Sequence, residues 1–127
     1  MSHIIDSQSG FLSPDDSVHT AGERMRTEHK ESLPVTEERK FVGMVEDPLA
    51  DVQVSRFGHS PYKTLVSETM NREATYCFED DDCDTVLKRM SEQNLEQLPV
   101  VDRDMKILGM VTSVQIKAAL ERTSVQD

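Results

Sequence analysis

The chain contains Leu33-Pro34-Val35 followed by Gly43-Met44-Val45, and it repeats both motifs in the same order as Leu98-Pro99-Val100 and Gly109-Met110-Val111. Two copies of this pair in a chain of 127 residues are hard to obtain by chance. Self-similarity at a fixed period is the sequence signature of a repeat architecture. We therefore interpret the chain as two copies of one structural unit.

The similarity extends to both sides of these motifs. A shift of 65 positions places Arg24-Met25 on Arg89-Met90 and Glu31 on Glu96, and one inserted residue then makes the shift 66. The same shift of 65 also aligns Asp15-Asp16 with Asp80-Asp81 and Thr20 with Thr85. A chain of this length has room for one compact domain, or for two small repeats that share a core.

Each half is predicted to contain the same series of elements. A short extended piece comes first, over residues 10–12 and 75–78, and an acidic helix start follows at residues 14–17 and 79–82. We expect carboxylates there to accept hydrogen bonds from free helix N–H groups. Apolar side chains then recur at helical spacing, as Val18, Ala21 and Met25 in the first half and as Cys83, Val86, Leu87 and Met90 in the second.

The two quoted motifs of each half are predicted to form two strands, with a charged turn between them. A closing helix over residues 114–121 follows in the second half, and Leu49, Val52 and Arg56 form its weaker counterpart close to Pro48. The sequence therefore predicts a mixed α+β fold of two β-α-β-β-α repeats.

A connector separates the halves at residues 56–63, where Gly58 and Pro61 interrupt the regular pattern. We place the first repeat, with its linker, at residues 1–60 and the second at residues 61–127.

This order of elements resembles the CBS (cystathionine-β-synthase) domain, and two in tandem resemble the unit called a Bateman module. The segment 66–70, Val-Ser-Glu-Thr-Met, is similar to the opening motif of the family, residues 98–102 to its central strand and residues 109–112 to its closing strand. The first half is a weaker, degenerate copy, with Ile4-Ile5 in place of the opening motif and Glu46 in place of the closing Thr. The resemblance implies two repeats packed about a pseudo-two-fold axis with a cleft on each side, and modules that pair into a flat disc.

The resemblance also implies a ligand, because family members commonly bind AMP, ATP or S-adenosylmethionine in these clefts and thereby regulate an attached or partner protein. The binding motif of the family is Gly-h-x-Thr/Ser-x-x-Asp, and this chain keeps Thr112 but has Gln115 instead of the Asp. A Gln oxygen accepts one ribose hydrogen bond but lacks the charge that strengthens such bonds. The alternative is that Thr112 and Gln115 form a capping box at the start of the last helix, and the two roles are compatible.

The candidate ligand site takes its residues from the second half. We expect Thr75 and Tyr76 to make backbone contacts to the base. Gln97, Leu98 and Pro99 are expected to form a wall of the site, and Thr112 and Gln115 to approach the ribose and phosphate. A core position is the alternative for Tyr76. In the first half Glu46 and Leu49 occupy the hydroxyl and carboxylate positions of the motif, and a carboxylate repels phosphate. We expect that cleft to be empty, or to admit only an uncharged or cationic group.

Composition excludes several other classes of protein. A formal net charge of −10 argues against binding to nucleic acid or to an anionic membrane. The N-terminus lacks the pattern of a signal peptide, and no apolar run approaches the ~20 residues of a membrane helix, so we expect a cytoplasmic protein. Arg103, Lys106 and Lys117 are scattered and are interpreted as solvated surface, and the acidic run 79–82 as a helix start rather than a cation site.

No pattern of residues indicates catalysis. The four histidines have no metal-ligand spacing, and Cys77 and Cys83 have the spacing of neither a redox pair nor a zinc site, so we expect reduced thiols. A P-loop and a nucleophile elbow are both lacking from the sequence, which predicts that the protein is not an enzyme.

Two functions remain. The first is a regulatory binding module that senses an adenosine-containing ligand, requires no cofactor, modulates an unidentified partner protein and forms a homodimer. The second is a structural or dimerisation module that binds no ligand.

Overall fold

The computed structural model describes residues 10–47 and 49–125. These residues form two compact units, one spanning Gly10–Ala74 and the other running from Thr75 to the C-terminal helix. The predicted opening motif Ile4-Ile5, His3 and Pro48 lie outside the described residues.

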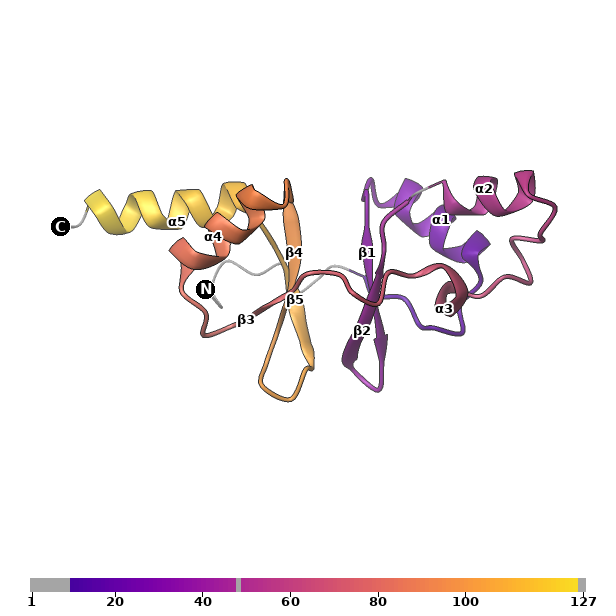
Figure 1. The fold of residues 1–127 in the computed structure, drawn as a ribbon, viewed down its shortest axis with the longest axis horizontal. Coiled ribbons are helices and arrows are strands. Elements are labelled where there is room, and N and C mark those ends of the chain that lie inside the picture. Colours follow the sequence, from indigo (N-terminus) through magenta and orange to yellow (C-terminus); the bar gives the residue numbers. More distant parts are fainter. Residues whose placement is uncertain (1–9, 48, 126–127) are drawn as a thin grey trace. The chain divides into compact units, whose positions relative to one another are not determined.

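The first unit is built on an antiparallel hairpin. Strands β1 (Leu33–Glu37) and β2 (Lys40–Val45) pair with each other, and Leu12 adds a single parallel bridge to Val35 in place of the predicted extended piece. Helices α1 (Val18–Thr27) and α2 (Ala50–Arg56) lie on the same side of this hairpin (Figure 1), and a short helix α3 (Val66–Thr69) follows the connector.

The second unit contains a three-stranded sheet in the order β3-β4-β5. Strand β3 (Cys77–Phe78) runs parallel to β4 (Gln97–Val101), which is antiparallel to β5 (Ile107–Thr112). Helices α4 (Cys83–Glu92) and α5 (Ser113–Val125) lie together on one side of the sheet (Figure 1). The mixed α+β class and the β-α-β-β-α order are thereby confirmed.

The repeat is visible in the strand register as well as in the sequence. Val35 lies opposite Gly43 in the first hairpin and Val100 lies opposite Gly109 in the second. A register irregularity follows at once in both, directly after Val35 and directly after Val100. Because the irregularity occurs at the same place in both hairpins, it is a structural property of the repeat unit.

Long-range hydrogen bonds repeat at the same spacing. The Arg24 guanidinium donates to the carbonyl of Phe11 over 2.7 Å, and that of Arg89 donates to the carbonyl of Tyr76 over 3.3 Å. Each bond ties the helix to the segment that precedes it. This side-chain contact is therefore repeated in both halves.

Each unit has its own apolar core, and the predicted helix stripes contribute to both. Val18, Ala21 and Met25 are buried in the first unit, and Val86 and Met90 in the second, whereas Cys83 and Leu87 pack against the core from partly exposed positions. The buried cluster of the second unit comprises Cys77, Val86, Met90, Leu98, Val100, Val111 and Ile116.

Residues 64–71 belong to the first compact unit, although their sequence resembles the opening of a second repeat. The Val66 side chain is buried in the first core, and its amide donates to the carbonyl of Asp16 over 2.8 Å. Met44 and Asn71 exchange two backbone hydrogen bonds, of 3.0 and 2.7 Å. The first compact unit therefore extends to Ala74, beyond the sequence boundary that we place at residue 60.

The start of α1 differs from the prediction. The hydroxyl of Ser17 caps the helix by accepting from the amide of Thr20 over 3.1 Å, and the Asp16 carboxylate instead accepts from the amide of Ser13 over 2.8 Å. An Asp side chain is short and bonds to nearby backbone, so Asp16 closes the turn before the helix.

The start of α4 differs in the same way. The Asp81 carboxylate accepts from the amide of Phe78 over 2.9 Å, and the N-cap residue Asp82 makes no side-chain hydrogen bond to the helix backbone. The predicted capping by this acidic run is therefore wrong in detail, although Asp84 still places a carboxylate in the first turn, where the helix dipole favours it.

Candidate functional site

The candidate ligand-binding residues gather at one end of the second unit's sheet. Strand β3 starts at Cys77 directly after Tyr76, β4 starts at Gln97, and β5 ends at Thr112. Because Gln97 and Thr112 are direct partners in the β4–β5 ladder, their side chains lie on the same face of the sheet. The set consists of Thr75, Tyr76, Gln97, Leu98, Pro99, Thr112 and Gln115.

Thr112 and Gln115 form a reciprocal capping box at the start of α5, as the sequence predicts. The Thr112 hydroxyl oxygen accepts from the amide of Gln115 over 3.1 Å, and the Gln115 side-chain oxygen accepts from the amide of Thr112 over 2.9 Å. A hydroxyl that accepts one bond still has its own proton to donate. The arrangement therefore caps the helix and leaves the Thr112 proton available to an acceptor.

Thr75 and Tyr76 are held by the helix beside them. The hydroxyl of Thr75 donates to the side-chain oxygen of Gln93 over 2.5 Å, and the carbonyl of Tyr76 accepts from Arg89. The Tyr76 ring is half-buried and lies edge-on to Phe78, with ring centroids 5.7 Å apart. The alternative of a core position for Tyr76 is therefore wrong, and its carbonyl is already engaged, so a base contact must share that oxygen.

Leu98 does not present its side chain as a wall. Only 2% of Leu98 is exposed, and it belongs to the core cluster of the unit. Successive side chains of a strand point to opposite faces, so Leu98 and Gln97 cannot both face a ligand. The half-buried Gln97 is the better placed of the two, and Pro99, next along the strand, is buried.

In the first unit Glu46 stands at the position of Thr112 and Leu49 at that of Gln115, and the carboxylates of Glu46 and Asp47 both accept hydrogen bonds. Glu46 accepts from the side-chain amide of Asn71 over 2.9 Å, which ties the end of β2 to residues 70–73. The Asp47 carboxylate accepts from the amide of Leu49 over 2.8 Å, directly before α2. Two negative charges at this helix start oppose the approach of a phosphate.

Arg103 is exposed, as the prediction of a solvated surface states, and it also contacts two side chains. Its guanidinium lies over the Phe78 ring, 4.2 Å from the centroid, and pairs with the Asp80 carboxylate over 2.7 Å. The three residues come from different segments, so no sequence spacing signals this arrangement. It connects the turn before β5 with the end of β3.

The described residues include a buried thiol, Cys77, and a partly buried one, Cys83. Burial raises the pKa of the Cys77 thiol to about 12, so the reactive thiolate is disfavoured at neutral pH. The described part of the chain brings together no group of three or more His, Cys, Asp or Glu side chains that could hold a metal ion. Among these same residues, no helix has the length and apolar character needed to cross a membrane.

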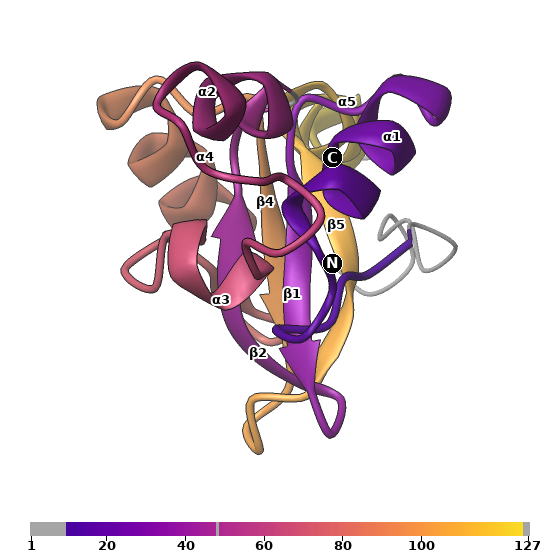
Figure 2. The same ribbon diagram turned by 90° about the vertical axis from the view of Figure 1, so that its right-hand side faces the viewer.

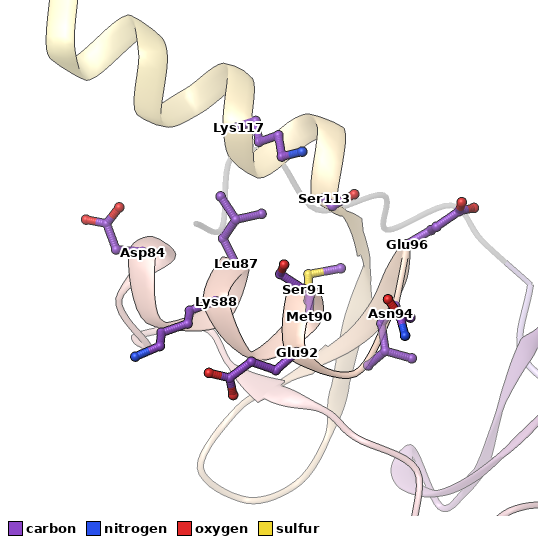
Figure 3. Close-up of a pocket in the computed structure, with 11 residues that line it drawn as sticks. Asp84, Leu87, Lys88, Met90, Ser91, Glu92, Asn94, Glu96, Ser113 and Lys117 are labelled. Carbon is purple, nitrogen blue, oxygen red and sulfur yellow. The ribbon is translucent and has the colours of Figure 1, made fainter.

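A pocket of about 640 Å³ lies between α4 and α5 (Figure 3). None of the seven candidate residues lines it, although Ser113, which follows Thr112, does. It is therefore separate from the site that the sequence predicts.

Comparison with known families identifies the repeats. The model of the CBS domain matches residues 2–47 and again residues 66–122. Among curated proteins, an inosine-5'-monophosphate dehydrogenase of Thermoplasma acidophilum is 29% identical over 105 residues, which cover 83% of this chain and 20% of that protein. A homoserine O-acetyltransferase of Methanosphaera stadtmanae is 24% identical over 106 residues, with 83% and 21% covered. The chain thus spans about a fifth of the length of these relatives.

Solved structures show the same fold. The CBS-pair protein CBSX2 from Arabidopsis thaliana has a TM-score of 0.79 at 22% identity, with 97% of this chain and 95% of that chain covered. The CBS domain pair of protein MJ0100, solved in complex with 5-methylthioadenosine and S-adenosyl-L-methionine, has a TM-score of 0.73 at 24% identity, with 96% and 95% covered.

Proposed function

Because the chain belongs to the CBS domain family and carries two copies of the domain in tandem, we propose that it is a regulatory module that binds an adenosine-containing ligand and thereby modulates a partner protein. AMP, ATP and S-adenosylmethionine are the candidate ligands, and no further cofactor is required.

One observation carries this proposal above the others: the Thr112 hydroxyl at the start of α5. The capping box holds this hydroxyl at the N-terminus of a helix of 13 residues, where free N–H groups and the helix dipole favour an anion. A ligand phosphate or ribose hydroxyl at this point would accept the Thr112 proton. The similar CBS pair of MJ0100 was solved with two adenosine-derived ligands, which supports this ligand class.

The second repeat supplies the polar groups of the site, and the first repeat supplies few. Thr75, Gln97, Thr112 and Gln115 offer hydroxyl and amide groups at one end of the sheet. Glu46 and Asp47 of the first repeat place carboxylates at the matching position, so we assign that side to no phosphate-bearing ligand.

Regulation requires that the ligand distinguish two states of the module. A ligand shifts an equilibrium only by its differential affinity for those states. We propose that the two states differ in the packing of the repeats and that a partner protein binds one of them better. The module acts as a cytoplasmic homodimer, has no catalytic activity of its own, and binds neither nucleic acid nor membrane.

A structural or dimerisation module is the second candidate, and two observations favour it. Gln115 stands where family members have the ribose-binding Asp, and its oxygen already accepts from the amide of Thr112. Glu46, which replaces the hydroxyl of the first repeat, is engaged by Asn71. Under this function both ligand sites would have been lost.

Thermal unfolding with AMP, ADP, ATP, S-adenosylmethionine and NAD at millimolar concentration separates the two functions. A ligand present at about 100 times its dissociation constant adds about 2.7 kcal/mol, which moves the midpoint of a domain of this size by several degrees. GTP at the same concentration is the control for nonspecific effects of phosphate. A shift with an adenosine compound but not with GTP supports the sensor, and no shift with any of them rules out the sensor for these ligands.

A further inference from the structure

The two helix pairs are closed in different ways. In the first unit, the Arg26 guanidinium of α1 makes two hydrogen bonds to the Asp51 carboxylate of α2, of 3.0 and 2.9 Å. Gly22 makes room for this carboxylate, because a Cβ at that position would lie only 2.7 Å from Asp51 Cγ. Asp51 is buried, with 7% exposed. An internal carboxylate thus fills the space between α1 and α2.

The second unit lacks every part of that arrangement. The shifts that align the halves place Leu87 on Gly22, Ser91 on Arg26 and Lys117 on Asp51. A hydroxyl and an ammonium therefore stand where a guanidinium and a carboxylate meet in the first unit. These three residues line the pocket between α4 and α5.

The lining of this pocket combines an apolar surface with a few polar groups. Leu87 points toward α5 from below, and the ammonium of Lys117 extends toward the side of Ser113 (Figure 3). The side chains of Lys88 and Glu92 point away from α5 in the same view. The apolar members are Leu87, Met90 and Leu95, and the hydroxyl and amide members are Ser91, Ser113 and Asn94.

Lys117 is an exposed residue at the edge of the pocket, as its interpretation as solvated surface predicts. It forms no ion pair with another of the described side chains. The volume of about 640 Å³ lies within the roughly 300–1,000 Å³ that small-molecule pockets occupy. Asp84 and Glu96 also belong to the lining, which disfavours a ligand with several negative charges such as a nucleoside triphosphate.

We propose that the α4–α5 pocket binds a small carboxylic acid with an apolar body. Its carboxylate pairs with Lys117 and takes the role that the Asp51 carboxylate has between the helices of the first unit. Its apolar part covers Leu87 and Leu95, and Ser91 and Ser113 donate further hydrogen bonds. This site is distinct from the adenosine site, so each can be tested without the other.

The test uses simple acids and their uncharged counterparts as probes. Hexanoate and benzoate, each up to 10 mM, are titrated into the ¹⁵N-labelled full chain, with hexan-1-ol and benzyl alcohol as controls. We expect amide shifts concentrated in α4 and α5 for at least one acid. The matching alcohol should bind severalfold more weakly, because an ion pair with an exposed ammonium, worth about 0.2–1 kcal/mol, is lost. No shifts with any probe, or equal affinity for acid and alcohol, would overturn the proposal.

Variants identify the group that is responsible. Lys117→Met keeps most of the apolar stem and removes the charge, so the acid should bind severalfold more weakly. Lys106→Met, in the turn before β5, removes an equal charge elsewhere and should change nothing. The combination Leu87→Gly, Ser91→Arg and Lys117→Asp transfers the arrangement of the first unit and should abolish acid binding. Undiminished binding in Lys117→Met, with a native spectrum, would refute the assignment; should the triple variant not fold, Lys117→Met decides alone.

Discussion

Replacing Thr112 by Val is the perturbation that tests the helix cap and the ligand site together. Val has nearly the shape of Thr and an equal preference for a strand, so the end of β5 is left intact. What disappears is the hydroxyl, and with it the 3.1 Å bond from the amide of Gln115. The Gln115 side chain can still accept from the amide at residue 112, so half of the capping box survives.

The expected loss of stability follows from this count of bonds. Removing the side-chain oxygen of a helix cap costs about 1 kcal/mol, within a range of about 0.5–2 kcal/mol. For a chain of 127 residues this corresponds to a midpoint lower by roughly 3–5 °C. Ligand affinity should fall by more, roughly 10- to 100-fold, because a hydrogen bond to a charged phosphate is worth about 1.5–3 kcal/mol.

Thermal unfolding with and without the adenosine compounds measures both effects in one experiment. Thr112→Ser keeps the hydroxyl and is the matched control. Its unfolding midpoint and its ligand-induced shift should each change by less than about half as much as in Thr112→Val. A wild-type midpoint in Thr112→Val would refute the role of this hydroxyl as a cap. A full ligand-induced shift in Thr112→Val would remove Thr112 from the binding site.

Three further predictions concern the buried groups of each unit. Gly22→Ala should lower the unfolding midpoint, because its Cβ would lie 2.7 Å from Asp51 Cγ. Adding Asp51→Ala to this variant should recover part of the loss, and an unchanged midpoint in Gly22→Ala alone would contradict this packing. The Arg26 hydrogen bonds hold the pKa of Asp51 below its ordinary value, so the ionised carboxylate stabilises the fold above about pH 4, and this stabilisation is lost as the pH falls through the folded pKa. Denaturant titrations at pH 6 and pH 3 should show a larger loss of unfolding free energy in the wild type than in Asp51→Asn, and equal losses would argue against the pair. Burial raises the pKa of Cys77 to about 12, compared with about 8.5 in the unfolded chain, so between these values only the unfolded thiol loses its proton. The unfolding free energy should therefore fall more steeply in the wild type than in Cys77→Ala as the pH rises from 9 to 11, and parallel curves would exclude this linkage.

The local parts of the structure could be read from the sequence. The two helix stripes, the paired strands and the capping box of Thr112 with Gln115 all depend on residues close together in the chain. The most distant strand partners are Gln97 and Thr112, 15 positions apart. The repeat supplied a second, independent copy of each pattern, which is why even the degenerate first half was recognisable.

The helix caps and the residues that border the ligand site were less predictable, because they depend on the direction in which a side chain points as well as on sequence spacing. The Asp16 carboxylate bonds backward to Ser13 rather than forward to the helix, although either direction fits the same sequence. The sequence predicts that Leu98 borders the ligand, and in the structure it fills the core, because the helices packed on a strand decide which of its faces turns inward.

The sequence alone determined that this protein is a tandem repeat of β-α-β-β-α units, since each unit's order and periodicity are local properties. Only the tertiary structure decided that Val66 belongs to the core of the first unit, that Arg26 meets Asp51 between two helices, and that Lys117 borders an open pocket at the matching place in the second. These contacts join residues about 25 or more positions apart in the chain. Their free energy comes from burial and charge pairing that exist only after the helices have packed, so no local pattern records them.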